Sequence, residues 1–537
     1  MKKHNASKVV LITIMAFLLL TWIFPAAYFS SEYVEQGRVQ MGLFDLFNYP
    51  VTALSYFGYI AFFLVLVGGF YGILCKIPAY RAFLDKIVAE AKGKEKIVLS
   101  IFVVLIALLV SICGAQVGIA LFIPFVVSII LLMGYDKIVA GLVTVGSICV
   151  GLLGTTYAGS NISILTGVFA LDYDYLIWVR FIILLIGIIL LLFNIFMYIK
   201  HNFEGVKIKI EKKSVNKEEI EEKVVVEKVE PVKKNTNKPS NKTTGKNTTK
   251  KSSNKKSSSS THKSVNKAAL KEEDVIIVKE SIAEEDTFAP RKVEGKYKTW
   301  PIVLVFVLLF LLFTLAFIPW NQFEVSLFAD ITSNVQKFEL FNFPLFAKLL
   351  GTFNAFGEWA ITDLFLPLAL SILLLAIIYK VSFEEVADGF VDGAKRALAP
   401  AVIVILLYTV LVLVTYHPFQ LVIYKAILGL SKGFNIATTT FVAILCGLFN
   451  SDIAYSFQSV VPYYSSVVAN VENYKLSAII FQSMYGLTML VAPTSLTLMA
   501  ILAYLDVPYK DWMKNIWKLL LELFIVLLIV FIILALV

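Results

Sequence analysis

Residues 152–165 read LLGTTYAGSNISIL. This stretch closes a long apolar run and brings glycines, hydroxyl side chains and an asparagine together within ten positions, 154–163. An apolar run of that kind belongs inside a lipid bilayer, where unpaired backbone and hydroxyl groups are unfavourable. The stretch therefore predicts a helix that is broken within the membrane.

The composition around this break is that of a membrane protein. Of the 537 residues, 58% are hydrophobic and 16% are charged, and the mean hydropathy is +0.79. Average soluble domains carry about 25% charged residues. The charged residues fall in gaps between apolar blocks of about 20 residues, the length of helix that crosses a bilayer. The chain is expected to be an all-α polytopic membrane protein.

Sequence motifs for enzymes and cofactors are missing. The four cysteines lie scattered in apolar runs, without the spacing of a metal site or a disulfide framework. The sequence contains no phosphate-binding loop, no zinc motif and no nucleophile elbow. We therefore expect neither catalytic residues nor a cofactor, apart from a coupling ion, Na⁺ or H⁺.

The chain divides into two membrane halves around a polar segment. The expected boundaries are 1–204, 205–297 and 298–537. Each half contains a pair of short apolar blocks, at 96–134 and 435–468, and such pairs suit re-entrant hairpins better than full spans.

The order of features repeats between the halves. Charged stretches at 81–94 and 383–397 have helical apolar periodicity and predict interfacial amphipathic helices. Later in each half an apolar run ends in a hydroxyl-rich break, at 154–163 and at 492–497. The shared order predicts two structural repeats.

Orientation follows from placing lysine and arginine in the cytoplasm. The N-terminus and the polar segment then lie in the cytoplasm of a bacterial-type cell, and the protein in its plasma membrane. An additional span at 397–416 reverses the second half. The prediction is two inverted repeats with about nine transmembrane helices and two opposed hairpins, as in many secondary transporters.

The segment 205–297 carries much of the net charge of +9. Its centre, KPSNKTTGKNTTKKSSNKKSSSSTHK at 238–263, has too few apolar residues to form a core, which predicts a disordered cytoplasmic linker. Binding to anionic lipid head groups is the alternative. Nucleic acid is not an expected partner, because interleaved aromatic residues are missing.

Polar clusters fall at the expected hairpin tips and helix breaks. Carbonyl and side-chain oxygens suit a hard cation such as Na⁺, and helix N-termini attract a carboxylate. For any single residue, close helix packing is the alternative, since serine, threonine and glycine are common there. The candidate substrate- or ion-binding residues are Ser111, Gln116, Thr155, Thr156, Ser160, Asn161, Asn450, Ser451, Asp452, Gln482, Thr494 and Ser495.

Asp452 is distinctive because carboxylates within the membrane are usually functional. It is a candidate to bind a proton, Na⁺ or a substrate ammonium group, and a carboxylate at a wet hairpin tip without a specific partner is the alternative. The clusters contain no basic residue. A dianion would therefore depend on helix dipoles, hydroxyl groups and bound cations.

The closing segment, FQSMYGLTMLVAPTSLTLMAILAYLDVPYKDWMKNIWK at 481–518, resembles the YfcC-like, C4-dicarboxylate anaerobic carrier family. The similarity lies in the PTS at 493–495 and in a VPY…W signature formed by 507–509 and Trp512. FIPFVVSIILLMGYDKIVAG at 122–141 is similar to the family's segment after its first hairpin.

The resemblance implies kinship with divalent-anion/Na⁺ symporters and aminobenzoyl-glutamate transporters in the ion transporter superfamily. It implies a scaffold domain, a transport domain, a homodimer and an elevator-type motion. The chain departs from the family at Val117 and Gly118, where acidic residues are typical, and at FNSDIAYS (449–456), where a small, glycine- and serine-rich tip is typical. By position, the resemblance implies Na⁺ and carboxylate binding at Ser160, Asn161, Thr494 and Ser495.

The expected function is secondary active transport of a small carboxylate-bearing solute, an amino acid or a dicarboxylate, coupled to an ion gradient or to exchange. An ion channel or a non-transporting membrane scaffold is the alternative. The expected partners are this solute and membrane lipid.

Overall fold

The computed structural model describes residues 5–114, 116–204, 295–351, 353–431 and 433–536. The predicted linker lies outside the described residues, except for 295–297. Residues Met1–Tyr198 and Lys279–Val537 form one compact unit, which contains both membrane halves. Helices dominate this unit and the only strands in its described part form two short hairpins, which confirms the all-α polytopic class.

The first half runs from α1 to the π-helix η3. Its elements are α1 (Asn5–Ile23), β1 (Ala26–Phe29), β2 (Tyr33–Gly37), α2 (Leu43–Leu74), α3 (Pro78–Ala91), α4 (Glu95–Cys113), η1 (Gly118–Leu121), α5 (Ile123–Leu132), α6 (Lys137–Gly141), η2 (Leu142–Gly146), α7 (Ser147–Leu153), α8 (Gly159–Phe169), α9 (Ile177–Ile199) and η3 (Lys200–Glu204).

The second half runs from α13 to α24. Its elements are α13 (Trp300–Phe317), η4 (Trp320–Phe323), α14 (Leu327–Lys337), β3 (Glu339–Leu340), β4 (Phe343–Pro344), α15 (Leu345–Leu350), η5 (Ile361–Leu364), α16 (Phe365–Tyr379), α17 (Phe383–Tyr416), α18 (Gln420–Leu428), α19 (Ile436–Phe449), α20 (Ile453–Gln458), α21 (Val461–Val467), η6 (Val471–Asn473), α22 (Tyr474–Met489), α23 (Leu496–Leu505) and α24 (Tyr509–Leu536).

Within the described residues, eight helices are long and apolar enough to cross a membrane, against about nine expected spans. Two expected spans are interrupted, at the breaks between α7 and α8 and between α22 and α23. Helix α4, expected as one limb of a hairpin, is long enough to cross a membrane by itself. Re-entry of the two hairpins stays a prediction.

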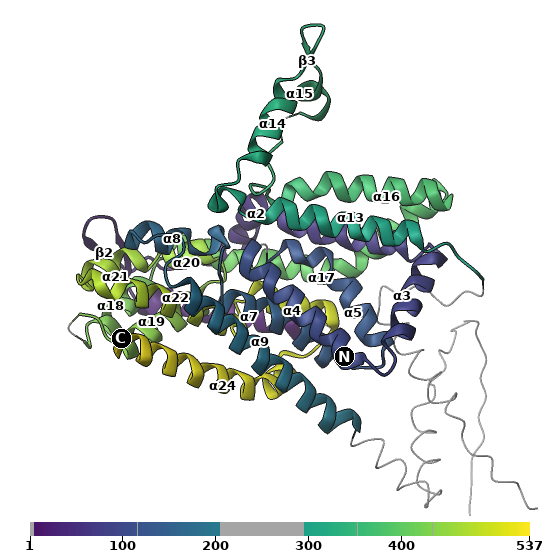
Figure 1. Cartoon of the computed structure of the whole chain (residues 1–537). Coiled ribbons are helices and arrows are strands. Elements are labelled where there is room, and N and C mark those ends of the chain that lie inside the picture. The colour runs from purple at the N-terminus through teal and green to yellow at the C-terminus, as the bar shows by residue number, and fades with distance from the viewer. Residues whose placement is uncertain (1–4, 115, 205–294, 352, 432, 537) are drawn as a thin grey trace, which may run out of the picture. The chain divides into compact units, whose positions relative to one another are not determined.

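Helices α2 and α17 pack along each other in antiparallel directions (Figure 1). A Cβ atom added to Gly393 of α17 would collide with the backbone of α2 at Gly68 and Gly72. At the opposite ends of the two helices, Tyr49 Oη lies 2.7 Å from His417 Nε2. Small residues thus bring the two backbones into direct contact, as in tightly packed membrane helices.

The stretch 383–397 does not form a separate interfacial helix, contrary to expectation. It forms the first turns of α17, and the hydroxyl of Ser382 caps the helix by accepting the N–H of Glu385 at 3.2 Å. Its buried residues Gly389 and Gly393 pack against α2, so a protein surface covers this face of the stretch. The short helix that follows the span is α18 instead, just as α3 follows α2.

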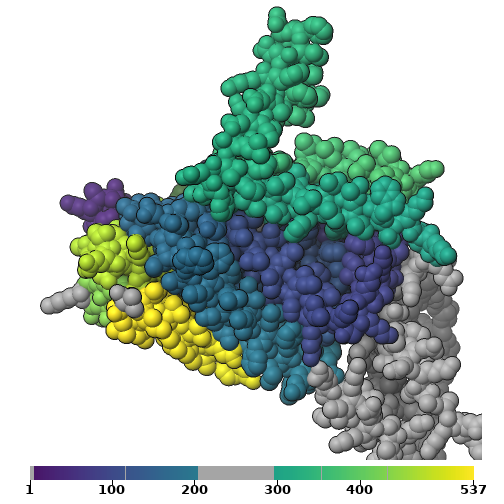
Figure 2. All heavy atoms as spheres, viewed as in Figure 1, coloured from purple at the N-terminus to yellow at the C-terminus, as the bar shows by residue number. Residues whose placement is uncertain are grey.

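Helices α9 and α24 lie side by side along one face, as the blue and yellow spheres of Figure 2 show. Asn194 of α9 donates from Nδ2 to Glu522 Oε2 of α24 at 2.6 Å. These are the last helices of the two halves, and each follows a broken span. Each of them is therefore close enough in sequence to the preceding break to contact it.

Candidate functional site

The end of α4 organises the first break. The carbonyl of Ser111 accepts the N–H groups of Thr156, Tyr157 and Ala158 at 2.9, 3.2 and 3.3 Å. The Ser111 hydroxyl donates to the carbonyl of Gly154 at 2.7 Å. Ser111 and Thr156, both predicted to bind ligand, therefore satisfy the backbone of the break itself.

Helix α22 supports the same break from the second half of the chain. Gln482 donates from Nε2 to the Thr155 carbonyl at 2.9 Å, and its Oε1 accepts the hydroxyl of Tyr175 at 3.1 Å. The Thr155 hydroxyl donates to the Leu152 carbonyl at 2.9 Å. Thr155 and Gln482 thus join the two membrane halves at the break, and both are buried.

Arg180 is a basic residue at the first break, although none was expected at the clusters. Its side chain is fully buried, and it donates from Nη1 to the Thr156 carbonyl at 2.9 Å and from Nη2 to the Tyr173 carbonyl at 2.7 Å. The guanidinium lies 4.4 Å from the ring centroid of Tyr175. The sequence contained a signal for this role, an arginine inside the apolar run that forms α9. Charged residues are rare in membrane spans and usually have a function.

The second break is held to the other hairpin. Thr494 donates its hydroxyl to the carbonyl of Leu448, near the end of α19, at 2.8 Å. Ser495 caps α23 by accepting the N–H of Leu498 at 3.3 Å. Each break is therefore fastened to the end of a hairpin's first limb, and Thr494 serves this purpose in the second half.

The VPY…W signature satisfies the carbonyl groups of the second break. Trp512 donates its indole N–H to the Leu490 carbonyl at 2.8 Å, and Tyr509 donates its hydroxyl to the Val491 carbonyl. Both donors lie in the first turn of α24. These two side chains donate to carbonyl groups of the second break, as Arg180 of α9 donates to the Thr156 carbonyl of the first break.

Asn450 and Asp452 shape the tip of the second hairpin. Asn450 Oδ1 accepts the N–H of Asp452 at 2.7 Å, and Asp452 Oδ1 accepts the N–H of Tyr455 at 2.9 Å, which caps α20. The carbonyl of Ser451 accepts the hydroxyl of Tyr485 at 2.5 Å. The tip is thus rigidly hydrogen-bonded, and one face of it borders a cavity.

A cavity of about 550 Å³ lies where the first hairpin tip, the first break and the second hairpin tip meet. The neighbouring walls come from α2, α17, the start of α23 and the loop between α13 and α16. Of the predicted site residues, those that line the cavity are Gln116, Ser160, Asn161, Ser451 and Asp452; Ser111, Thr155, Thr156, Asn450, Gln482, Thr494 and Ser495 do not.

Asn161 and the start of α8 form one side of this cavity. The Asn161 side chain is 2% exposed, and its Nδ2 has no hydrogen-bond partner within the described part of the chain. Ala158, the residue before α8, provides no capping side chain. The N–H of Asn161 donates to the Ala158 carbonyl at 3.0 Å, which leaves the N–H groups of Gly159 and Ser160 to an anionic ligand.

Tyr59, Trp359 and Tyr408 line the cavity but could not be identified from the sequence. Tyr59 and Tyr408 lie near enough to Asp452 to interact electrostatically with its carboxylate. Tyr59 comes from α2 and Tyr408 from α17, far apart in sequence. Apolar periodicity gives no reason to distinguish them from ordinary aromatic residues of a membrane helix.

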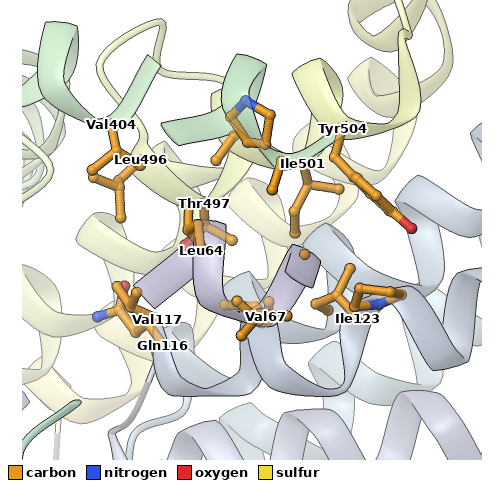
Figure 3. Close-up of a pocket in the computed structure, with 17 residues that line it drawn as sticks. Leu64, Val67, Gln116, Val117, Ile123, Val404, Leu496, Thr497, Ile501 and Tyr504 are labelled. Atoms are coloured by element: carbon orange, nitrogen blue, oxygen red, sulfur yellow. The ribbon is translucent and has the colours of Figure 1, made fainter. Parts of the chain in front are cut away.

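A second, smaller cavity of about 80 Å³ shares part of its wall with the large one. Its lining is aliphatic for the most part, and Figure 3 shows Val404 and Ile501 opposite Val67 and Ile123. The small cavity is lined by Gly68 of α2 and Ala397 of α17, whereas Tyr59 and Tyr408 line the large one. The small cavity therefore lies nearer to the contact between Gly68 and Gly393. The shared lining residues are Gln116, Val117, Leu496 and Thr497.

Comparison with known proteins supports the resemblance read from the closing segment. The family model described as C4-dicarboxylate anaerobic carrier matches residues 320–536. No curated protein and no solved structure matches the chain. The matched part contains the second hairpin, the second break and the VPY…W signature. The second membrane half is therefore similar to the C4-dicarboxylate anaerobic carrier family.

Proposed function

We propose that the protein is a secondary active transporter of a small carboxylate-bearing solute in the plasma membrane of a bacterial-type cell. The observation that carries this proposal is the 550 Å³ cavity, because both hairpin tips and one helix break border it. Residues more than 290 positions apart, Asn161 and Asp452, line this single space. Such a cavity between broken helices is the usual substrate site of secondary transporters.

The position of the cavity suggests which side of the membrane it serves. Tyr59 and Tyr408 lie in the parts of α2 and α17 that lead toward Tyr49 and His417, away from the ends joined by Gly68 and Gly393. The loop between α13 and α16 also lines the cavity. With the N-terminus and linker in the cytoplasm, the site in this conformation faces outward.

Alternating access would then require the site to reach the opposite side. In the proposed elevator-type mechanism, α2, α13, α16 and α17 act as the scaffold, because α2 and α17 are locked by backbone contact at their glycines. The hairpins, the two breaks and α22 are held together by the hydrogen bonds described above. These bonds favour movement of that group as one body.

Ion coupling is proposed at the same group of residues. Ser160 and Asn161 offer side-chain oxygens at the cavity, whereas Thr494 and Ser495 lie at the second break outside its lining. Protein donors already occupy several break carbonyls, including those of Thr155 and Leu490. A Na⁺ ion in the cavity would therefore depend chiefly on side-chain oxygens and on the solute itself.

The test is ligand binding and flux with the full-length protein. We expect purified protein to be stabilised by one or more small carboxylates in a thermal-shift screen with and without Na⁺. Proteoliposomes should show saturable counterflow of the same solute. Asn161→Ala should weaken both signals, and Thr166→Ala, a change on the same helix outside the cavity, should leave them intact. Flux that does not saturate would favour a channel instead.

A further inference from the structure

The large cavity has two chemically different sides. On the first, the hydrogen-bond donors are the unpaired amide nitrogen of Asn161 and the N–H groups at the uncapped start of α8. Donors and a positive helix end favour a carboxylate. This side alone would accept any carboxylic acid that fits.

Another part of the lining carries negative charge. Asp452 uses Oδ1 to cap α20, and within the described residues its other oxygen, Oδ2, has no hydrogen-bond partner. Glu358 also lines the cavity, with Oε1 accepting Nδ2 of Asn321 at 2.9 Å. The described lining residues include no lysine, arginine or histidine to balance these two carboxylates.

Aromatic residues form a further part of the lining. Tyr59, Tyr408, Trp359 and Phe317 line the same cavity. Aromatic faces together with a carboxylate are the surroundings in which proteins bind ammonium and guanidinium groups. A second carboxylate of a ligand placed here would meet like charge and aromatic faces.

Arg180 does not neutralise the negative charge of Asp452 and Glu358 in the cavity lining. Nη1 and Nη2 donate to the carbonyls of Thr156 and Tyr173, and the guanidinium lies over the ring of Tyr175. Its Nε is buried without a hydrogen-bond partner in the described part of the chain, and Arg180 does not line the cavity. Its charge strengthens the side of the first break, where the carboxylate is expected. The lining therefore combines hydrogen-bond donors at the start of α8 with the carboxylate of Asp452.

We infer that the transported solute is an amino acid, whose ammonium group is held at Asp452 and whose carboxylate is held at Asn161 and the start of α8. This inference rests on the proposed transport function and specifies its substrate class. It separates this chain from a carrier of dicarboxylates, because a dianion would place one of its charges against Asp452 and Glu358.

The first test compares ligand pairs that differ only in the amino group, on purified wild-type protein. Suitable pairs are alanine and propionate, leucine and 4-methylpentanoate, and aspartate and succinate, with lysine and malate added to the panel. Binding is measured by thermal shift, and transport by counterflow in proteoliposomes. We expect at least one amino acid to bind at least tenfold more tightly than its partner, the effect of about one charge-assisted hydrogen bond.

The second test removes the charge without removing the helix cap. Asn is as good a cap as Asp, so Asp452→Asn should keep the bond to Tyr455 and the melting temperature of the free protein. It should weaken amino-acid binding by about 10- to 100-fold. Asp136→Asn is the control, since Asp136 caps α6 through the N–H of Val139 and does not line the cavity. Its Oδ2 also accepts the Tyr198 hydroxyl at 2.7 Å, so its effect on stability is measured alongside.

The outcomes separate the substrate class from the function. Tighter binding of succinate or malate than of any amino acid would overturn the inference and leave the transport function standing. The inference would also fail, with the transport function intact, if Asp452→Asn lowered amino-acid affinity no more than Asp136→Asn. If no member of the panel bound or was exchanged, the proposed function would fail, and the inference with it. Amino-acid preference in the wild type decides the matter even if Asp452→Asn does not fold.

Discussion

Gly114 allows the tip of the first hairpin to touch the start of α8. It ends α4 with a left-handed backbone, φ +67°. A Cβ atom there would lie 2.6 Å from Ser160 Oγ and 2.9 Å from Ala158 Cβ. Ordinary contacts of a Cβ atom begin at 3.4 Å, so one partner would have to move by about 0.8 Å (3.4 − 2.6). Gly114→Ala should therefore displace the carboxylate side of the cavity.

Gly134 provides a matched control for this substitution. It also has a left-handed backbone, φ +87°, but an added Cβ would meet nothing within 4 Å. Both alanine variants should lose about 1–2 kcal/mol of stability from the backbone alone. Crowding should cost Gly114→Ala about another 1–3 kcal/mol, in part relieved by the movement of Ser160.

The assays are thermal unfolding of the purified protein and saturation of counterflow in proteoliposomes. Both variants should unfold at a lower temperature than wild type, and Gly114→Ala at the lower of the two. Only Gly114→Ala should weaken solute binding, by about tenfold if one hydrogen bond to the carboxylate is misaligned. Equal effects of the two substitutions in both assays would refute the argument that the α4 tip positions α8.

Two further substitutions test the supports of the site. Gly393→Ala should destabilise the protein by about 1–3 kcal/mol or more, because its Cβ would collide with α2 at Gly68. Gly167→Ala, in open space on α8, should instead raise the free energy of unfolding by about 0.5–1 kcal/mol. Melting temperatures that change in the same direction for both variants would contradict this. Trp512→Phe should lower the free energy of unfolding by about 1–3 kcal/mol, because it leaves the Leu490 carbonyl unpaired. Trp517 has an exposed side chain, so Trp517→Phe should change the free energy of unfolding by no more than about 0.5 kcal/mol. Equal melting temperatures of the two variants would contradict the role of Trp512.

The sequence predicted the class of fold and the places where helices break. Apolar blocks of bilayer length require helices, because every backbone polar group in lipid must be satisfied within the segment. Glycine at 154 and proline at 493 interrupt those helices through their local backbone properties, whatever the helices pack against. It also predicted kinship with the carrier family, since PTS and VPY…W are local patterns.

The sequence did not reveal which polar residues face a ligand and which hold the breaks together. Asn161 and Thr156 look alike in a list of polar membrane residues, yet Asn161 keeps an unpaired amide at the cavity and Thr156 is tied to Ser111. Nor did periodicity indicate that 383–397 would continue into α17, because the surface that covers it belongs to α2.

Local sequence determined the helices, the breaks and the chemistry available at them, because these depend on neighbouring residues and on the lipid solvent. Only the tertiary structure decided the use of each polar group. Gln482 and Thr155 are 327 positions apart, and a buried polar group costs free energy unless a partner reaches it. Groups that found protein partners, such as Ser111, Thr155 and Gln482, form the framework of the first break; Asn161 keeps an unpaired amide nitrogen, and we propose that it and Asp452 bind the solute.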